Sequence, residues 1–421
     1  MKATQLIKEI NEGKYNERLE ALYGGRDERK RYILAIENYI SLYGDGDVSV
    51  YSVAGRSEIS GNHTDHNRGC VLAASVSVGI IAVAAPCDER VISIKSEGFD
   101  IDICPLDGEF DKEEYRFTSR AIIAGVVDGF EKRGLKTGGL KAYTTSTVLK
   151  GSGLSSSAAF EDCVGLMLSH MYNGGTVSPV QLAEISKYAE NEFFGKPCGL
   201  MDQVACAYGG FVFIDFENED PMITPIPFDI SSKGYALCIL NTGGNHADLN
   251  EDYASIPRDM KAVAALFGRK VLRGLTEKDI YSKSEEIRET LGDRALMRAV
   301  HFIRENERVI KQRDALIASD MPLFLKYVTE SGSSSFKYLQ NVYTVKNVNE
   351  QGISLALCLA ESLLDGTGGA CRVHGGGFAG TIQAFVPTDT VARFKEETEK
   401  IFGKASCSIL FVRAEGACRV I

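Results

Sequence analysis

The chain has 421 residues, of which 44% are hydrophobic and 25% charged, and 47 Lys and Arg against 57 Asp and Glu give a net charge of −10. This length exceeds one ordinary core and predicts two domains, and the composition excludes disordered, collagen-like and coiled-coil classes. An acidic surface repels nucleic acid and anionic lipid, so we expect neither a nucleic acid nor a membrane as a partner.

Hydrophobic periodicity and turn residues indicate helices and strands that do not alternate regularly. The expected elements of the first half are helices at 2–44, a strand at 48–53, a polar loop at 55–69, strands at 71–85 and 91–96, a helix at 118–132, a strand at 140–148 and helices at 160–171 and 179–194. Those of the second half are a strand at 236–240, a helical stretch at 254–364, two strands within 370–386, a helix at 391–402 and a strand at 408–412. The mixture favours an α+β fold in two lobes, which we divide into residues 1–230 and 231–421.

The longest apolar run, residues 71–86, is short of the roughly 20 residues that a membrane helix needs. Its Val, Ile, Ala and Ser content favours a buried strand. The first twenty residues are polar, so we expect no signal peptide. The eleven cysteines are odd in number and include no C-x-x-C pair, which predicts reduced thiols and a cytoplasmic location.

Several common enzyme motifs are missing from the sequence. It contains no G-x-x-x-x-G-K-[ST], no H-E-x-x-H and no G-x-S-x-G, which excludes the Walker-type nucleotide site and the usual zinc-protease and α/β-hydrolase signatures. One G-x-G-x-x-G occurs at Gly375, Gly377 and Gly380. A dinucleotide-binding fold requires this loop to open a helix, but the following TIQAFVP is typical of a strand.

A glycine- and serine-rich segment, KGSGLSSSAAF at residues 150–160, lies between an expected strand and an amphipathic helix. Gly151 and Gly153 allow the backbone to approach a ligand, and the free N–H groups of the coming helix favour phosphate. Ser156 and Ser157 add hydroxyls suited to phosphate or to a magnesium ion. The alternative is a solvated turn with an ordinary Ser N-cap.

Two carboxylates flank a turn in AENEFFGKPCGLMDQ, residues 189–203. Glu190 and Asp202 stand on either side of Gly-Lys-Pro-Cys-Gly, where a carboxylate can bind metal or orient a hydroxyl. In isolation the same pattern is typical of a helix end followed by a solvated acidic loop.

The third segment is AGRSEISGNHTDHNRG, residues 54–69, which follows a strand. So many hydrogen-bonding groups in one short loop suit a polyhydroxylated ligand, whereas a zinc site is only weakly indicated and an exposed polar turn is the alternative. The polar candidates in this loop are Arg56, Asn62, His63, Asp65 and His66.

In order and spacing, these segments resemble the GHMP small-molecule kinases and, within them, the galactokinase branch. GRSEISGNHTDH resembles a sugar-binding signature that usually runs Gly-Arg-Val-Asn-Leu-Ile-Gly-Glu-His-Thr-Asp-Tyr. GSGLSSSAA is similar to the family's ATP loop, EFFGKPCGLMDQ to the catalytic segment, and RVHGGGFAGTIQAFV at 372–386 to the third glycine-rich motif. The resemblance covers residues 46–421 and implies a two-lobed α+β fold, with an N-terminal lobe like ribosomal protein S5 domain 2 and a ferredoxin-like C-terminal lobe.

The resemblance also implies an ATP-dependent kinase that phosphorylates the anomeric hydroxyl of a galactose-like sugar. ATP and Mg²⁺ are the implied cofactors, the sugar is the implied partner, and we expect a monomer. By the family's pattern Asp202 and Arg56 are catalytic, and Ser156 and Glu190 bind the metal. The substrate-binding residues are Asn62, His63, Asp65, Gly199 and Tyr253, and the nucleotide-binding residues are Gly151, Ser152, Gly153, Leu154, Ser155, Ser156 and Ser157.

Two residues of the sugar loop depart from the galactokinase pattern, because Asn62 replaces a glutamate and His66 replaces a tyrosine. The glutamate normally accepts a hydrogen bond from the sugar's 6-hydroxyl, and an asparagine there is uncharged and can also donate. Galactose is therefore the first expectation, with galacturonate, arabinose and N-acetylgalactosamine as alternatives. A sensor that binds sugar and ATP without turnover is the remaining alternative, as is a kinase of a non-sugar alcohol.

Overall fold

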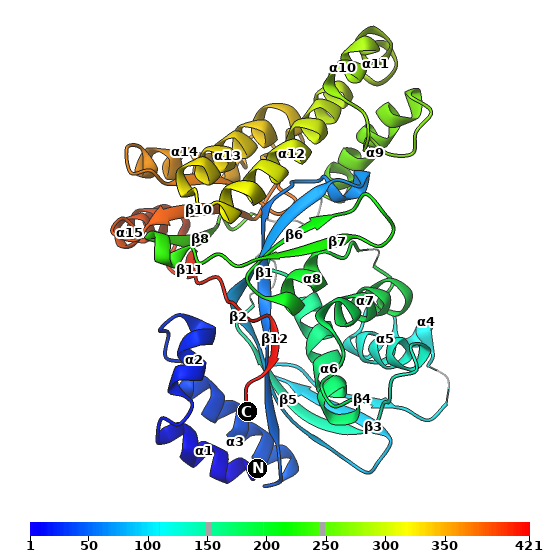
Figure 1. Cartoon of the computed structure of the whole chain (residues 1–421), viewed down its shortest axis with the longest axis vertical. Coiled ribbons are helices and arrows are strands. Elements are labelled where there is room, and N and C mark those ends of the chain that lie inside the picture. Colours follow the sequence, from blue (N-terminus) through cyan, green and yellow to red (C-terminus); the bar gives the residue numbers. More distant parts are fainter. Residues whose placement is uncertain (109, 149–153, 197, 245–248) are drawn as a thin grey trace.

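The structure is a computed structural model that describes residues 1–108, 110–148, 154–196, 198–244 and 249–421. Its two sheets belong to two lobes, which lie one above the other in Figure 1. The expected two-lobed α+β fold is confirmed. A lobe boundary between residues 230 and 231 remains our proposal, because the last strand returns to the first sheet.

The first sheet has eight strands among the described residues, with the order β12-β1-β2-β5-β3-β4, and β6 and β7 extend it beside β2. Neighbouring strands are antiparallel except β3 and β5. The bounds are β1 (Ser49–Ser60), β2 (Cys70–Pro86), β3 (Val91–Ser96), β4 (Ile101–Pro105), β5 (Leu140–Ser146), β6 (Phe211–Asp215), β7 (Met222–Ile226) and β12 (Ala417–Arg419).

Helices cover both faces of this sheet. On one side lie α1 (Ala3–Asn11), α2 (Asn16–Tyr23) and α3 (Arg29–Tyr43), and on the other α4 (Lys112–Tyr115), α5 (Ser119–Lys132), α6 (Ser156–Tyr172), α7 (Pro179–Ala189) and α8 (Met201–Tyr208) (Figure 1). A one-turn π-helix, η2 (Glu190–Phe194), continues α7. Because both faces are covered, β2 is buried at every position from Cys70 to Ala84, which explains its unbroken apolar run.

The second sheet is antiparallel, with the order β11-β8-β10-β9 among the described residues. Its strands are β8 (Tyr235–Asn241), β9 (Ala370–His374), β10 (Thr381–Pro387) and β11 (Cys407–Leu410). The helices of this lobe are α9 (Asn250–Leu266), α10 (Glu277–Ser282), α11 (Ser284–Leu291), α12 (Asp293–Ile317), α13 (Met321–Ser334), α14 (Gly352–Leu364) and α15 (Val391–Phe402), and η4 (Ser335–Leu339) is a π-helical turn after α13. Elsewhere in the described residues, η1 (Asp65–Asn67) and η3 (Ser231–Lys233) are short 3-10 turns.

Several sequence-based element predictions need correction. The strand expected to end at residue 53 continues to Ser60, so residues 55–60 of the expected polar loop belong to a largely buried strand. The helical stretch at 254–364 is several separate helices, and the strand at 408–412 is β11, Cys407–Leu410. The sequence does not predict the elements α4, α8, β4, β6, β7 and β12.

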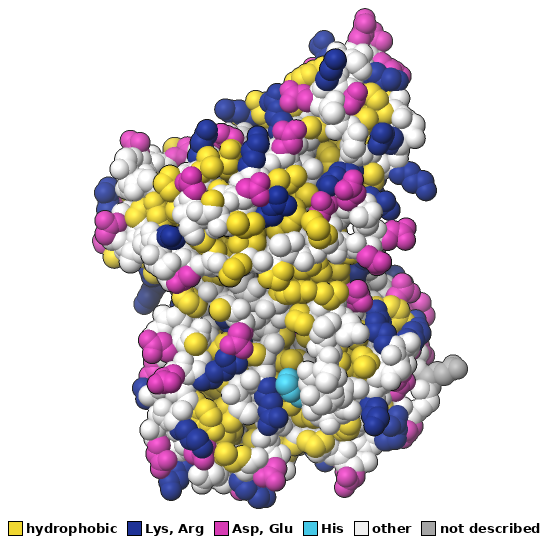
Figure 2. Space-filling view, in the orientation of Figure 1, with side chains coloured by type: hydrophobic (Ala, Val, Ile, Leu, Met, Phe, Trp, Pro, Cys, Tyr) yellow, Lys and Arg dark blue, Asp and Glu magenta, His cyan; other side chains and the backbone are white. Residues whose placement is uncertain are grey.

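The surface carries mixed charge. On the face drawn in Figure 2, Lys and Arg side chains are interspersed with Asp and Glu over both lobes. Among the described residues, none of the helices is long and apolar enough to cross a membrane.

Candidate active site

The centre of the site is an ion pair between two segments far apart in the sequence. Arg56 lies on β1, and Asp202 lies in the first turn of α8. The Arg56 guanidinium donates from Nε to Asp202 Oδ1 at 2.7 Å and from Nη2 to Oδ2 at 2.6 Å. This fork-to-fork geometry fixes both the position and the orientation of the carboxylate.

The carboxylate of Asp202 is held ionised. Burial alone would raise its pKa, but the charge and hydrogen bonds of Arg56 and the hydroxyl of Ser155 hold the pKa below the ordinary value. Ser155 Oγ donates to Asp202 Oδ2 at 2.7 Å. With 30% of its side chain exposed, Asp202 remains open to a ligand. The two expected catalytic residues, Arg56 and Asp202, therefore form one ion pair, and the hydroxyl of Ser155 donates a hydrogen bond to Asp202.

The ATP-loop prediction falls partly outside the described residues, because Gly151, Ser152 and Gly153 lie in the segment 149–153. The described end of the loop is close to the ion pair, since the backbone N–H of Arg56 donates to the carbonyl of Leu154 at 3.2 Å. Ser155 has a left-handed backbone with φ of 55°, and α6 begins at Ser156. The first turn of α6 therefore starts beside Asp202.

Glu190 provides a buried carboxylate behind this loop. Its side chain is 4% exposed, and Ser157 Oγ donates to Oε1 at 3.5 Å. Lys196 Nζ lies 3.5 Å from the same oxygen. Of the two serine hydroxyls considered for a metal, Ser157 is thus the one that the structure places on Glu190, while Ser156 begins the helix.

A second carboxyl, that of Glu161 on α6, lies next to Glu190. Gln203 Nε2 donates to Glu161 Oε2 and to Glu190 Oε2, both at 3.0 Å. Burial and the nearby charge of Glu190 raise the pKa of Glu161 well above its ordinary value. Its Oε1 has no protein partner among the described atoms.

The sugar-loop candidates lie near the loop that precedes α8. A Cβ added to Gly199 would stand 3.4 Å from Asp65 Oδ2, so the loop before α8 faces Asp65 without an intervening side chain. His66 Nε2 lies 3.7 Å from Asp65 Oδ1, and the His63 and His66 rings are 6.1 Å apart. The pKa of His63 is lowered to about 4, mainly by burial and also by the neighbouring His66. His63 is therefore neutral at pH 7.

Three consecutive carbonyls of the glycine-rich loop between β9 and β10 accept hydrogen bonds from three of the expected sugar-site residues. Asn62 Nδ2 donates to Gly375 O at 2.6 Å, His63 Nε2 to Gly376 O at 2.9 Å, and the Tyr253 hydroxyl to Gly377 O at 2.9 Å. We call residues 375–377 the glycine triplet. Its carbonyls join the sugar loop of the first lobe to α9 of the second.

The side chain of Asn62 is fully buried, so it belongs to the wall of the site. Besides Gly375 O, its amide nitrogen donates to Glu58 Oε1 at 3.0 Å, and its Oδ1 accepts from Asn341 Nδ2 at 2.6 Å. Its backbone carbonyl accepts from His301 Nε2 at 3.1 Å. This residue is therefore held on every side by protein groups.

The whole end of β1 is embedded in polar groups of the second lobe. Ser57 Oγ bonds His374 Nε2 at 3.1 Å, and Arg372 Nη1 and Gln383 Nε2 donate to the carbonyl of Ile59 at 3.0 and 2.9 Å. Glu305 accepts from Ser60 Oγ and from the N–H of Gly61, both at 3.2 Å. These bonds replace the solvent that a polar strand end would otherwise need.

Sequence reasoning missed the supporting residues of this site. Glu58, Asn341 and Arg372 are at most 8% exposed and form its buried polar contacts, as do Glu305 and Gln203. Glu58, Gln203 and Arg372 lie inside the quoted segments but were not singled out, whereas Asn341 and Glu305 lie outside every motif. Only the family pattern around 54–69 and 372–386 pointed to their neighbourhood.

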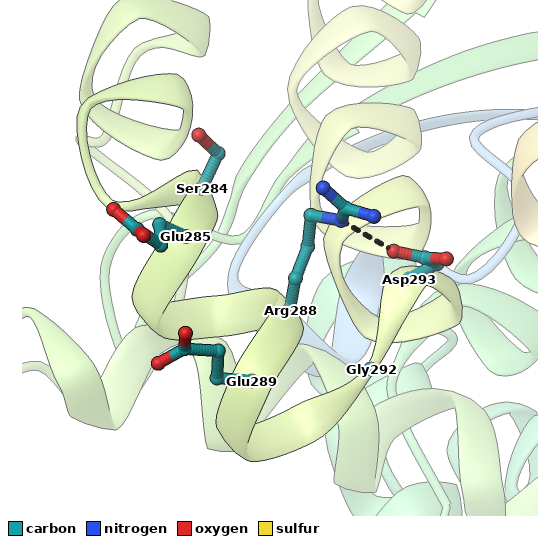
Figure 3. A pocket seen from close by; sticks show the side chains of 6 residues that line it. All are labelled: Ser284, Glu285, Arg288, Glu289, Gly292 and Asp293. Carbon is teal, nitrogen blue, oxygen red and sulfur yellow. Dashed lines mark hydrogen bonds and ion pairs between the residues drawn. The ribbon is translucent and has the colours of Figure 1, made fainter.

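A hollow elsewhere in the molecule lacks such a constellation. The hollow in Figure 3 is lined by residues of α11 and the start of α12, at the tip of the second lobe. Its one cation, Arg288, is turned onto Asp293 at 2.7 Å, and both side chains are more than 60% exposed. A hollow whose charged groups already pair in solvent gives no reason to place the chemistry there.

Two family models and several known proteins are similar to this chain. The galactokinase galactose-binding signature matches residues 37–86, and the GHMP kinases N-terminal domain matches residues 121–210. A galactokinase of Glaesserella parasuis serovar 5 (strain SH0165) is 31% identical over 352 residues, covering 81% of this chain and 86% of the relative. One from Actinobacillus pleuropneumoniae serotype 3 (strain JL03) is 29% identical over 368 residues, covering 86% and 91%.

Solved structures share the fold. The Lactococcus lactis galactokinase complexed with galactose has a TM-score of 0.75 at 21% identity, covering 92% of this chain and 98% of that one. A mevalonate kinase of Methanococcus jannaschii has a TM-score of 0.61 at 13% identity, covering 87% and 99%. At such identities these two likenesses show the fold alone, whereas the curated relatives carry the family assignment. The chain belongs to the galactokinase family of GHMP kinases, which are ATP-dependent kinases of small molecules.

Proposed function

We propose that this enzyme transfers the γ-phosphoryl group of ATP to the anomeric hydroxyl of galactose. The observation that carries the proposal is the ionised Asp202, oriented by Arg56 and Ser155 at the mouth of the ATP loop. The names of the curated relatives and the match to the galactose-binding signature at residues 37–86 support galactose as the sugar.

In the proposed reaction the sugar's anomeric oxygen attacks the γ-phosphorus, and the bond to the β–γ bridging oxygen breaks. The proton of the hydroxyl passes to Asp202, and ADP leaves with the electron pair of the broken bond. Arg56 holds the carboxylate in place and adds positive charge next to the transferring group. Positioning and charge are most of what phosphoryl transfer needs from a protein.

The sugar would lie among Asp65, Gly199, His63 and Tyr253, with Asn62 in the wall behind it. Asp65 is the acceptor for ring hydroxyls, and the bare Gly199 leaves room beside it. His63 donates its Nε2–H to Gly376 O, which leaves its Nδ1 as a neutral acceptor. Leu154, Ser155, Ser156 and Ser157 would contact the nucleotide, together with Gly151, Ser152 and Gly153.

Mg²⁺ belongs to this proposal as well. No cluster of three or more His, Cys, Asp or Glu that could hold a metal occurs among the described residues. Glu190 with the hydroxyl of Ser157 fits an ion whose other ligands are phosphate oxygens and water, which is the usual magnesium arrangement. Ser156 is the alternative hydroxyl. Bound there, the ion would neutralise charge on the phosphates.

Galacturonate is disfavoured by the charges around the sugar loop. The buried Arg372 lies 3.4 Å from the carboxylate of Glu58, Arg56 is paired with Asp202, and His63 is neutral at pH 7. Arg372 and Arg56 therefore each already face a carboxylate, and the His63 ring carries no charge that could attract the carboxylate of galacturonate. Arabinose and N-acetylgalactosamine remain the alternative sugars.

We also propose a monomer in the cytoplasm. The eleven cysteines are all free, which fits a reducing compartment.

The test is magnesium-dependent ATP consumption with galactose, arabinose, N-acetylgalactosamine, galacturonate and mevalonate, using Asp202→Asn as the blank. We expect the highest kcat/KM with galactose. Turnover confined to another sugar would replace galactose in the proposal. Binding of sugar and ATP by calorimetry without turnover would make the protein a sensor.

A further inference from the structure

Asn341 lies at the centre of the contacts between the glycine triplet and the sugar loop, although no sequence motif includes it. It lies two residues after the end of η4 and is fully buried. Its Nδ2 donates to Asn62 Oδ1 at 2.6 Å and to Gly376 O at 3.1 Å. One amide group thus bonds the sugar loop and the glycine triplet at once.

The backbone of Asn341 holds the same loop from a second direction. Its carbonyl accepts from the N–H of Phe378 at 2.5 Å, and Phe378 has an uncommon left-handed φ of 57°. A Cβ on Gly377, where φ is 84°, would stand 2.0 Å from this carbonyl oxygen. The loop can therefore take this conformation only because residue 377 is glycine and Asn341 receives the next N–H.

A run of three glycines has unusually large conformational freedom, so its position depends on outside contacts. The triplet holds His63 through Gly376 O and Tyr253 through Gly377 O. A displacement of the triplet would move both of these side chains. Tyr253 also packs on Phe378, with ring centroids 5.5 Å apart.

We propose that Asn341 is a positioning residue for sugar binding, which fixes the glycine triplet against the sugar loop and thereby places His63 and Tyr253. The inference rests on the proposed function, since it takes His63 and Tyr253 as walls of the sugar site. Asn341 itself does not touch the sugar. It acts through Asn62 and Gly376.

The experiment compares Asn341→Ala, the isosteric Asn341→Asp and the milder Asn341→Ser, which keeps one donor. Asn173→Ala is the matched control, because it removes the amide contacts to Lys136 O and Leu168 O at the far end of α6. Each protein is measured for melting temperature, for KM of ATP, and for kcat and KM with galactose and its 2-, 3-, 4- and 6-deoxy analogues. Hydrogen exchange of peptides covering 61–66 and 372–380 is followed in parallel.

We expect Asn341→Ala and Asn341→Asp to raise the sugar KM about tenfold, with Asn341→Ser between them and wild type. The KM of ATP should stay within about twofold, since the residue is bonded only to the sugar side. The fold-loss should be equal for galactose and every deoxy analogue. Amides in 61–66 and 372–380 should exchange faster, whereas Asn173→Ala should leave exchange in both segments and the sugar KM unchanged.

Two outcomes would overturn the inference. A lower melting temperature with unchanged sugar KM and unchanged exchange in both segments would reduce Asn341 to a general stability role. A loss on galactose that disappears with one deoxy analogue would mean that Asn341 contacts that hydroxyl. Failure of the proposed function looks different, because wild type would then phosphorylate none of the sugars, while the exchange measurement would still decide whether Asn341 holds the loops.

Discussion

The side-chain amide of Asn62 donates a hydrogen bond to the carboxylate of Glu58 at 3.0 Å, and the carboxylate lies 3.4 Å from the guanidinium of the buried Arg372. The sugar-binding signature that this loop resembles has asparagine at position 58 and glutamate at position 62. In this chain the two residue types are exchanged. The exchange keeps an amide–carboxylate contact and places the negative charge on the residue next to Arg372.

This contact predicts that the two positions are coupled. Asn62→Glu alone would put a second carboxylate beside Glu58 in a buried place, and we expect a loss of unfolding free energy on the order of 3 kcal/mol. The double variant Glu58→Asn/Asn62→Glu restores one amide and one carboxylate, so its loss should be smaller than that of Asn62→Glu alone. Urea unfolding of the single and double variants measures the coupling. Additive losses would show that the two positions are independent.

The proposed catalytic base, Asp202, gives a second prediction. Asp202→Asn keeps the shape of the side chain but removes the charge that accepts the proton. We expect kcat to fall by about 10²-fold or more, with ATP and sugar affinities by calorimetry nearly unchanged. Turnover close to that of wild type would remove Asp202 from the role of base.

The ion pair between Asp202 and Arg56 determines how kcat/KM falls at acid pH. Because the folded pKa of Asp202 is below its ordinary value, the carboxylate stays ionised as the pH falls to that value. In Arg56→Gln the effect of burial is no longer opposed, so the pKa of Asp202 should rise and the acid limb of kcat/KM should move toward neutral pH. Arg56→Lys keeps a charge and should shift the limb less. An acid limb at the same pH in all three proteins would contradict this electrostatic account.

Glu305 links the sugar loop to stability at low pH. Burial alone would raise its pKa, but Arg308, His301 and Arg372 lower the pKa to about 2. A depressed carboxylate pKa adds stability above the unfolded-state value of 4.5, and this stability is lost as the pH falls from there toward 2. The contribution at pH 7 is on the order of 3 kcal/mol.

We therefore expect Glu305→Gln to be less stable than wild type at pH 7, and the difference to narrow at pH 3. Denaturant unfolding at the two pH values measures this. A difference that is the same at both values would mean that the charge of Glu305 does not stabilise the fold.

Much of the fold could be predicted because its elements carry local signals. The helix expected at 391–402 is α15 with the same bounds, and the apolar run at 71–86 is the buried strand β2. The end of β1 could not be predicted, because Ser57, Glu58 and Ser60 are typical of a loop. They form a strand here since groups of the second lobe, such as His374 and Glu305, satisfy their side chains.

In the site, too, some residues could be predicted from sequence motifs and others could not. The segments around Arg56 and Asp202 were found from their motifs, and the structure brings the two residues together across 146 positions of sequence. That Ser157, rather than Ser156, contacts Glu190 depends on the helical phase at the start of α6, which a run of three serines does not reveal. Asn341 gave no signal, because its partners lie 279 and 35 positions away.

The most direct test of the whole account is the identification of the product. Purified protein is incubated with ATP, magnesium and galactose, and the product is examined by phosphorus NMR, with Asp202→Asn treated in the same way. The account predicts stoichiometric ADP and a phosphate coupled to the anomeric proton of the sugar, with neither formed by the variant. A phosphate on any other oxygen, or no phosphorylated sugar while both ligands bind, would contradict it.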